Sequence, residues 1–130
     1  LCKKHLKRGG TIVTQATSPF FSRQAFLCIQ KTMQEAGFST LPYHNHIPTL
    51  GEWGFVLGVD DQLLESQALK ETVQRMSFQD VEMRFLNRDA VISMVHFGKG
   101  VFEGGEKIKI NRESRPVLHE YYKQGRWEVY

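Results

Sequence analysis

Residues 11–59 constrain the fold most, because strand, helix and turn signals follow one another there with sharp boundaries. Residues 11–16 are rich in β-branched side chains, as is typical of a buried strand. A helical run occupies residues 23–36 and ends at Gly37, because glycine adopts the left-handed backbone of a helix C-terminus without strain. The helical periodicity of that run predicts one buried face, made of Ala25, Phe26, Ile29 and Met33.

Two further strand patterns follow the helix, at residues 38–47 and 53–59. The Pro-Thr-Leu-Gly sequence at residues 48–51 predicts a turn that joins them as an antiparallel hairpin. The order of strand, helix, strand, turn and strand is that of an α/β fold. We therefore predict the last third of a doubly wound sheet, finished by an antiparallel hairpin.

The pattern becomes mostly helical after residue 59. We predict helical segments over residues 62–76, as one helix or two, over residues 88–97 with Asn87 as N-cap, and from residues 114–116 to residue 123. We accordingly divide the chain into residues 1–59, the end of the α/β domain, and residues 60–130, a C-terminal extension packed on it.

Composition narrows the classes of function. Seventeen basic residues against fourteen acidic ones give a net charge of +3, which is too mild to indicate a nucleic-acid surface. No apolar run approaches the roughly 20 residues that span a bilayer. Cys2 and Cys28 are the only cysteines, which favours a reduced cytosolic setting over a disulfide framework. The sequence starts at Leu1, inside a predicted helix, so we expect a piece of a longer protein.

The candidate site residues lie at the end of the first predicted strand and around the turn before the last one. Gln15 ends the first strand, at the edge where open α/β sheets bind ligands; its amide either faces a polar ligand or bonds to the adjacent loop. Glu52 and Trp53 follow the predicted turn. A carboxylate beside an indole is a plausible seat for a protonated amine, and the alternative is a tight hairpin with Trp53 buried.

The two histidines of the second predicted strand, His44 and His46, alternate and therefore point to one face. Two imidazoles suit a metal ion, but a metal site needs a third and a fourth ligand. The remaining histidines are distant in the sequence. We therefore interpret this pair as a half-exposed strand edge and predict no metal site.

Several short motifs resemble those of the C-terminal half of spermidine synthases, most closely the bacterial branch that carries an N-terminal membrane region. These are Leu-Lys-Arg-Gly-Gly at residues 6–10, Gln15, Ser18-Pro19, Pro42-Tyr43-His44, Ile47-Pro48-Thr49 and Gly51-Glu52-Trp53-Gly54-Phe55. The tail extends the resemblance through Arg84-Phe85-Leu86, Asn111, Pro116-Val117-Leu118 and Tyr121-Tyr122.

The resemblance implies a Rossmann-like, methyltransferase-type sheet and transfer of an aminopropyl group from decarboxylated S-adenosylmethionine to a diamine such as putrescine. It implies that Gln15, Leu50, Glu52 and Trp53 contribute one wall of the diamine pocket. In the family topology the last strand inserts between the two before it, so we expect residues 53–59 to pair with residues 11–16. A cytoplasmic domain of a parent anchored in the inner membrane is implied as well.

The sequence lacks the family motifs that bind the nucleotide of decarboxylated S-adenosylmethionine and that supply the base which removes a proton from the amine. No glycine-rich turn follows a first strand, and no later acidic residue is placed to hold ribose hydroxyls. We assign no catalytic, cofactor-binding or metal-binding residue, and expect the chain alone to be inactive. The alternatives are an S-adenosylmethionine-dependent methyltransferase-like protein and a non-catalytic packing or oligomerisation module. An unpaired edge at residues 11–16 also predicts self-association.

Overall fold

The computed structural model describes residues 2–126, so Leu1 and residues 127–130 lie outside the description. The strands are β1 (Thr11–Gln15), β2 (Phe38–Ile47) and β3 (Gly51–Asp60). The helices are α1 (Cys2–His5), α2 (Arg23–Glu35), α3 (Ser66–Arg75), α4 (Arg88–Met94), the 3-10 helix η1 (Gly105–Lys107) and α5 (Leu118–Lys123). The result is a mixed α/β structure around a small antiparallel sheet.

The three strands lie in the order β1-β3-β2, with β3 antiparallel to both neighbours. Because β1 and β2 are each antiparallel to β3, they run parallel to one another. The predicted pairing of residues 11–16 with residues 53–59, with residues 38–47 at the sheet edge, is confirmed. The predicted hairpin is confirmed as well, since β2 pairs with β3 from Phe38 opposite Asp60 to Ile47 opposite Gly51.

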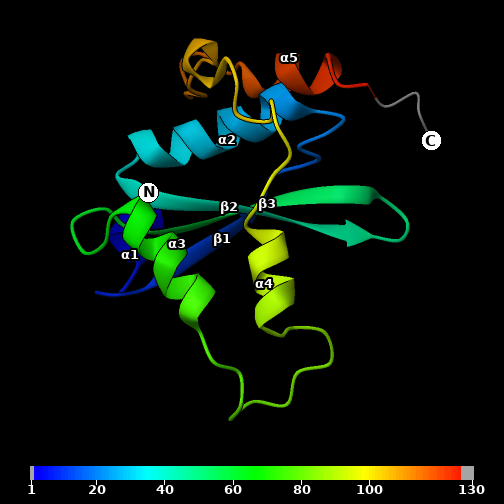
Figure 1. The fold of residues 1–130 in the computed structure, drawn as a ribbon. Helices are drawn as coiled ribbons and strands as arrows, with labels where there is room; N and C mark the ends of the chain where they lie inside the picture. Colours follow the sequence, from blue (N-terminus) through cyan, green and yellow to red (C-terminus); the bar gives the residue numbers. More distant parts are fainter. Residues whose placement is uncertain (1, 127–130) are drawn as a thin grey trace.

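Helices cover both faces of the sheet. Figure 1 shows α2 and α5 on one face, and α3 and α4 on the other. Each face has its own core. The α2 side is filled by Ala16, Phe26, Leu27, Cys28, Val56, Ile108 and Val117. The α3 side is smaller and is filled by Leu41, Leu69 and Val95. The extension therefore supplies residues to both cores.

Close packing of α2 on the sheet depends on a glycine. A Cβ at Gly54 would lie 2.6 Å from Cε2 of Phe26 and 2.9 Å from the carbonyl oxygen of Thr17. Phe26 is fully buried, so its ring has no space into which to move. Gly37, with φ +87°, ends α2 as predicted.

Three helix boundaries in the extension differ from the prediction. Residues 62–76 were expected to be helical, but the helix starts only at Ser66, because the carbonyl of Asp60 accepts the amides of Leu63 and Leu64 in a turn. Asn87 caps α4 as predicted, accepting the amide of Ala90 at 2.8 Å, yet α4 ends at Met94 rather than at residue 97. The last helix starts at Leu118, because a turn bridges residues 112 and 115.

Candidate functional site

The site is built where the carboxyl end of β1 meets the amino end of β3. Gln15 pairs with Phe55 at the last position of the β1–β3 ladder. The chain continues the pairing one step further, since Ala16 donates to the Gly54 carbonyl at 2.8 Å and Gly54 donates to the Thr17 carbonyl at 2.6 Å. These bonds bring Gln15 and the first residues of β3 to the same end of the sheet.

Glu52 and Trp53 both lie on β3, which begins at Gly51, two residues before the predicted start of that strand at residue 53. Neighbouring residues of a strand point to opposite faces. Gln15 pairs with Phe55, and Trp53 lies two residues before Phe55 on the same strand, so Trp53 and Gln15 share a face. Glu52 pairs with His46, and both side chains lie on the opposite face. The structure thus brings Gln15 and Trp53 to one face and separates Glu52 from them.

Leu50, the fourth predicted residue, lies in the turn before β3. Its amide donates to the carbonyl of Ile47 at 2.9 Å, which closes the turn. The side chain is 40% exposed. Its exposed apolar surface lies at the same end of the sheet as Gln15.

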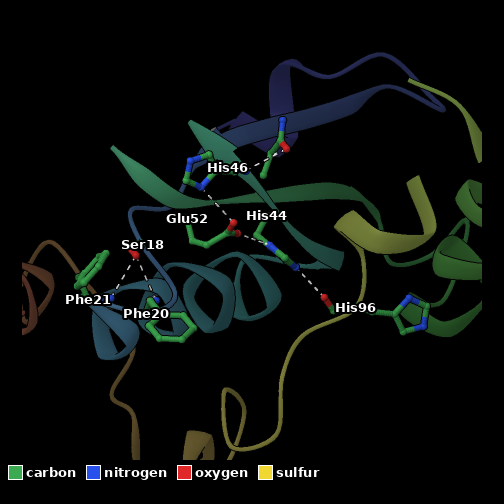
Figure 2. Close-up of polar contacts among 8 residues, drawn as sticks. Ser18, Phe20, Phe21, His44, His46, Glu52 and His96 are labelled. Carbon is green, nitrogen blue, oxygen red and sulfur yellow. Dashed lines mark hydrogen bonds and ion pairs between the residues drawn. The ribbon is translucent and has the colours of Figure 1, made fainter. Parts of the chain in front are cut away.

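Glu52 lies between two imidazoles, as Figure 2 shows. Its Oε2 is 2.6 Å from Nδ1 of His44, and its Oε1 is 3.6 Å from Nδ1 of His46. His44 is the more buried of the two histidines, with a side chain 24% exposed against 66% for His46. The two imidazoles therefore flank one carboxylate, and a protonated ring beside it would neutralise its negative charge.

The opposite nitrogen of His44 reaches the extension. Its Nε2 lies 2.6 Å from the backbone carbonyl oxygen of His96, and its ring lies 4.6 Å from the ring of Phe97. Sequence reasoning missed both contacts. The contact between Glu52 and the histidines could have been predicted from the register of the hairpin, which places Glu52 opposite His46. No local signal links His44 to a residue 52 positions later.

The turn after β1 contains a strained residue that the sequence analysis also missed. Thr17 has φ +60°, a left-handed backbone that β-branched residues rarely adopt. Its side chain is buried, and among the described residues its hydroxyl has no hydrogen-bond partner. Ser18 follows, and its hydroxyl accepts the amides of Phe20 and Phe21 (Figure 2). Strain of this kind is concentrated at functional sites in proteins.

A hollow of about 390 Å³ lies beside Gln15, between β1, α2 and the extension. It is lined by Ile12, Thr14, Gln15, Ile29, Thr32, Met33, Asn111 and Leu118. The lining is mainly aliphatic, with amide and hydroxyl groups at Gln15, Asn111 and the threonines. Such a surface suits the methylene chain of a small ligand with polar ends.

The residues present favour binding over covalent chemistry. Burial raises the pKa of the Cys28 thiol, which leaves it protonated and a poor nucleophile. Within residues 2–126, no group of three or more His, Cys, Asp or Glu side chains is arranged to hold a metal ion. What the arrangement offers is a carboxylate, an amide and aromatic surface, which are the groups that bind an alkylamine.

Comparison with known proteins decides the family. The model of the spermine/spermidine synthase domain matches residues 1–71. The chain belongs to the spermine/spermidine synthase family. The predicted resemblance to spermidine synthases is therefore confirmed, and the match includes all three strands of the sheet.

Relatives of this synthase-family chain include bacterial polyamine aminopropyltransferases. Polyamine aminopropyltransferase 2 of Aquifex aeolicus is 36% identical over 121 residues, which are 92% of this chain and 22% of that protein. Polyamine aminopropyltransferase 2 of Ralstonia nicotianae is 32% identical over 124 residues, or 95% of this chain and 22% of that protein. The polyamine aminopropyltransferase of Oceanobacillus iheyensis is 30% identical over the whole chain and 24% of its own length.

The synthase-family chain thus spans less than a quarter of the length of these curated relatives. The similarity continues through the extension, because these alignments cover far more of the chain than the family model does. Among the described residues, no helix is both long enough and apolar enough to cross a membrane.

Proposed function

We propose that this chain supplies part of the amine-binding wall of a polyamine aminopropyltransferase. In that reaction an aminopropyl group passes from decarboxylated S-adenosylmethionine to a diamine. The observation that carries the proposal is the meeting of Gln15, at the carboxyl end of β1, with the first residues of β3 at one end of the sheet. Ligands of α/β sheets bind at that edge.

Each candidate residue has a distinct role in this proposal. The Gln15 amide accepts a hydrogen bond from an amino group of the diamine, and Trp53 and Leu50 provide apolar surface for its methylene chain. Glu52, on the opposite face of β3, contributes negative charge at the same end of the sheet, which attracts the ammonium end. The hollow beside Gln15 offers aliphatic, amide and hydroxyl side chains, and none of Leu50, Glu52 and Trp53 lines it.

We place the residues that bind the nucleotide co-substrate and the catalytic base outside this chain. The sequence has no glycine-rich nucleotide turn, and its relatives are more than four times as long as the matched segment. In the intact protein, residues 1–59 would be the end of a doubly wound sheet and residues 60–130 an extension packed on it. The resemblance to the branch with a membrane region supports a cytoplasmic domain of a membrane-anchored parent.

A chimera tests the proposal. The matching segment of the Aquifex aeolicus polyamine aminopropyltransferase 2 is replaced by this chain, and aminopropyl transfer from decarboxylated S-adenosylmethionine to putrescine is measured. We expect an active chimera in which Gln15→Leu raises KM for putrescine about tenfold, the effect of losing one hydrogen bond to a charged group. The Gln124→Leu variant, which lies after α5, is the matched control and should leave KM unchanged.

Two outcomes would contradict the proposal. A folded chimera with no transfer activity would indicate a non-catalytic module, and equal KM values in the Gln15 and Gln124 variants would remove Gln15 from the diamine pocket. Nothing in residues 2–126 favours the methyltransferase-like alternative over aminopropyl transfer.

One observation favours association of the chain with itself. Strand β1 is an edge strand of the described sheet, and its Val13 side chain is 52% exposed. An unpaired strand edge recruits another strand. We propose that the isolated chain pairs through β1, which light scattering at several concentrations tests. A monomer mass that does not change with concentration would contradict this.

A further inference from the structure

The imidazole of His44 lies between two hydrogen-bond acceptors. Its Nδ1 faces the carboxylate of Glu52 at 2.6 Å, and its Nε2 faces the backbone carbonyl of His96 at 2.6 Å. Figure 2 shows the ring between these two oxygens, with the His96 side chain directed away. Both distances are short, as they are when a charged group takes part in the hydrogen bond.

Counting hydrogens settles what the ring must carry. A carbonyl oxygen only accepts, so Nε2 must hold a proton. A neutral imidazole has a single N–H, which would leave Nδ1 without a proton opposite an ionised carboxylate. With Glu52 ionised, two hydrogen bonds to two acceptors require the doubly protonated ring. His44 and Glu52 together therefore carry one proton more than a neutral histidine beside an ionised glutamate.

The groups around His44 support this reading. From the hairpin it meets Glu52 and the more distant His46, which lies 3.6 Å from the other carboxylate oxygen. From the segment after α4 it meets the His96 carbonyl and the Phe97 ring; the His96 ring itself is engaged through Nδ1 with the Ile92 carbonyl. From α2 the nearest aromatic is Phe26, packed on Phe97 at 5.8 Å. Among residues 2–126, no other ion pair reaches His44 or Glu52.

The segment held by His44 joins two parts of the extension. Residues 95–104 run from α4, on one face of the sheet, to η1 and α5 on the other (Figure 1). Arg23 of α2 holds the same segment further along, with Nε donating to the carbonyl of Val101 at 2.7 Å. Arginine stays charged at all ordinary pH values, whereas an imidazole gains and loses a proton. Of these two contacts between the segment and the rest of the chain, only the one made by His44 therefore depends on a proton.

We propose that His44 is a proton-dependent latch that ties the hairpin to the segment after α4. When His44 is an imidazolium, it bridges Glu52 and the His96 carbonyl and keeps Phe97 against the hairpin. Loss of the proton breaks one of the two hydrogen bonds, so docking of residues 95–98 weakens as pH rises. The Arg23 contact remains and limits the release to the part of the segment near His44. This inference does not depend on the proposed aminopropyl transfer.

Nitrogen-resolved NMR of the whole 130-residue chain, labelled with ¹⁵N, tests the latch without any ligand. At low pH we expect two protonated ring nitrogens for His44. As pH rises, one N–H signal should disappear, and the amide signals of Val95 and Phe97 should move with the same midpoint. The Val101 amide, next to the Arg23 contact, should move less.

Two variants separate the latch from a passive contact. Glu52→Gln keeps an oxygen near Nδ1 but removes the charge, and it should lose the second His44 N–H signal at a lower pH than the unchanged chain does. His46→Gln changes the neighbouring, more exposed imidazole and should keep both signals. The proposal is overturned if His44 carries a single ring proton while Phe97 remains docked, if both variants keep both signals, or if Val95 and Phe97 ignore the His44 titration.

Discussion

Substitution of Gly54 by alanine tests whether the approach of α2 to the sheet is as close as the structure indicates. The added Cβ would lie 2.6 and 2.7 Å from two ring carbons of Phe26 and 2.9 Å from the Thr17 carbonyl oxygen. Side-chain carbons do not approach other atoms so closely in folded proteins. Either α2 moves outward or β3 shifts, and both responses disturb the larger core.

The size of the effect follows from these contacts. Adding a methylene group to a packed core costs about 1–3 kcal/mol, and here the clash involves a fully buried ring and the backbone at once. We therefore expect Gly54→Ala to lower the free energy of unfolding by about 3 kcal/mol. With a urea dependence of about 2 kcal/mol per molar, the unfolding midpoint would fall by roughly 1.5 M.

Urea unfolding followed by circular dichroism measures this change. Gly98→Ala is the matched control, because a Cβ there would meet nothing within 4 Å and should change stability by less than about 0.5 kcal/mol. Trimming the ring in the double variant Phe26→Leu/Gly54→Ala should recover about 1 kcal/mol relative to the sum of the single changes. Equal midpoints for Gly54→Ala and Gly98→Ala would refute the argument.

Three further expectations can be checked on the same chain. Asn87→Ala removes the cap that accepts the Ala90 amide and should cost about 1 kcal/mol of unfolding free energy in urea, with Asn45→Ala on the hairpin as a comparison. Hydrogen bonds from the Gln62 amide and Lys3 hold the pKa of Asp60 below its ordinary 3.8, so its stabilising contribution exists above that value and is lost as pH falls through the lower folded value. The difference in urea midpoint between wild type and Asp60→Asn should therefore shrink on acidification below pH 3.8; a constant difference would contradict it. Calorimetry with methylthioadenosine should detect no micromolar binding, because the sequence has no glycine turn or ribose carboxylate; a micromolar constant would show that the nucleotide site lies in this chain.

Local signals in the sequence predicted the local structure well. The β-branched run before Ala16, the helix that ends at Gly37 and the cap at Asn87 each depend on residues within a few positions of one another. The insertion of β3 between β1 and β2 was a different kind of prediction. It depended on resemblance to a family, because strand order is fixed by contacts between distant residues and leaves no local trace.

The misplaced turn shows where local reasoning fails. The expected turn covered residues 48–51 and the expected strand began at residue 53, but residues 48–50 suffice for the connection, because the Leu50 amide bonds to the Ile47 carbonyl and Gly51 takes φ +69°. A three-residue turn followed by a left-handed glycine is a standard hairpin connection. Counting it would have placed Glu52 as well as Trp53 on the strand, with the two side chains on opposite faces. The contact of His44 with the His96 carbonyl had no such signal.

The central position of β3 has a consequence for how the chain acquires its structure during synthesis. Every ladder hydrogen bond of the described sheet has β3 as one partner, since β1 and β2 do not pair with each other. A chain that has emerged only as far as Leu50 therefore has both outer strands but not one bond between them. Until residue 60 is available, the described sheet lacks the strand that joins β1 to β2. The last of these three strands to be made is thus the one that connects the other two.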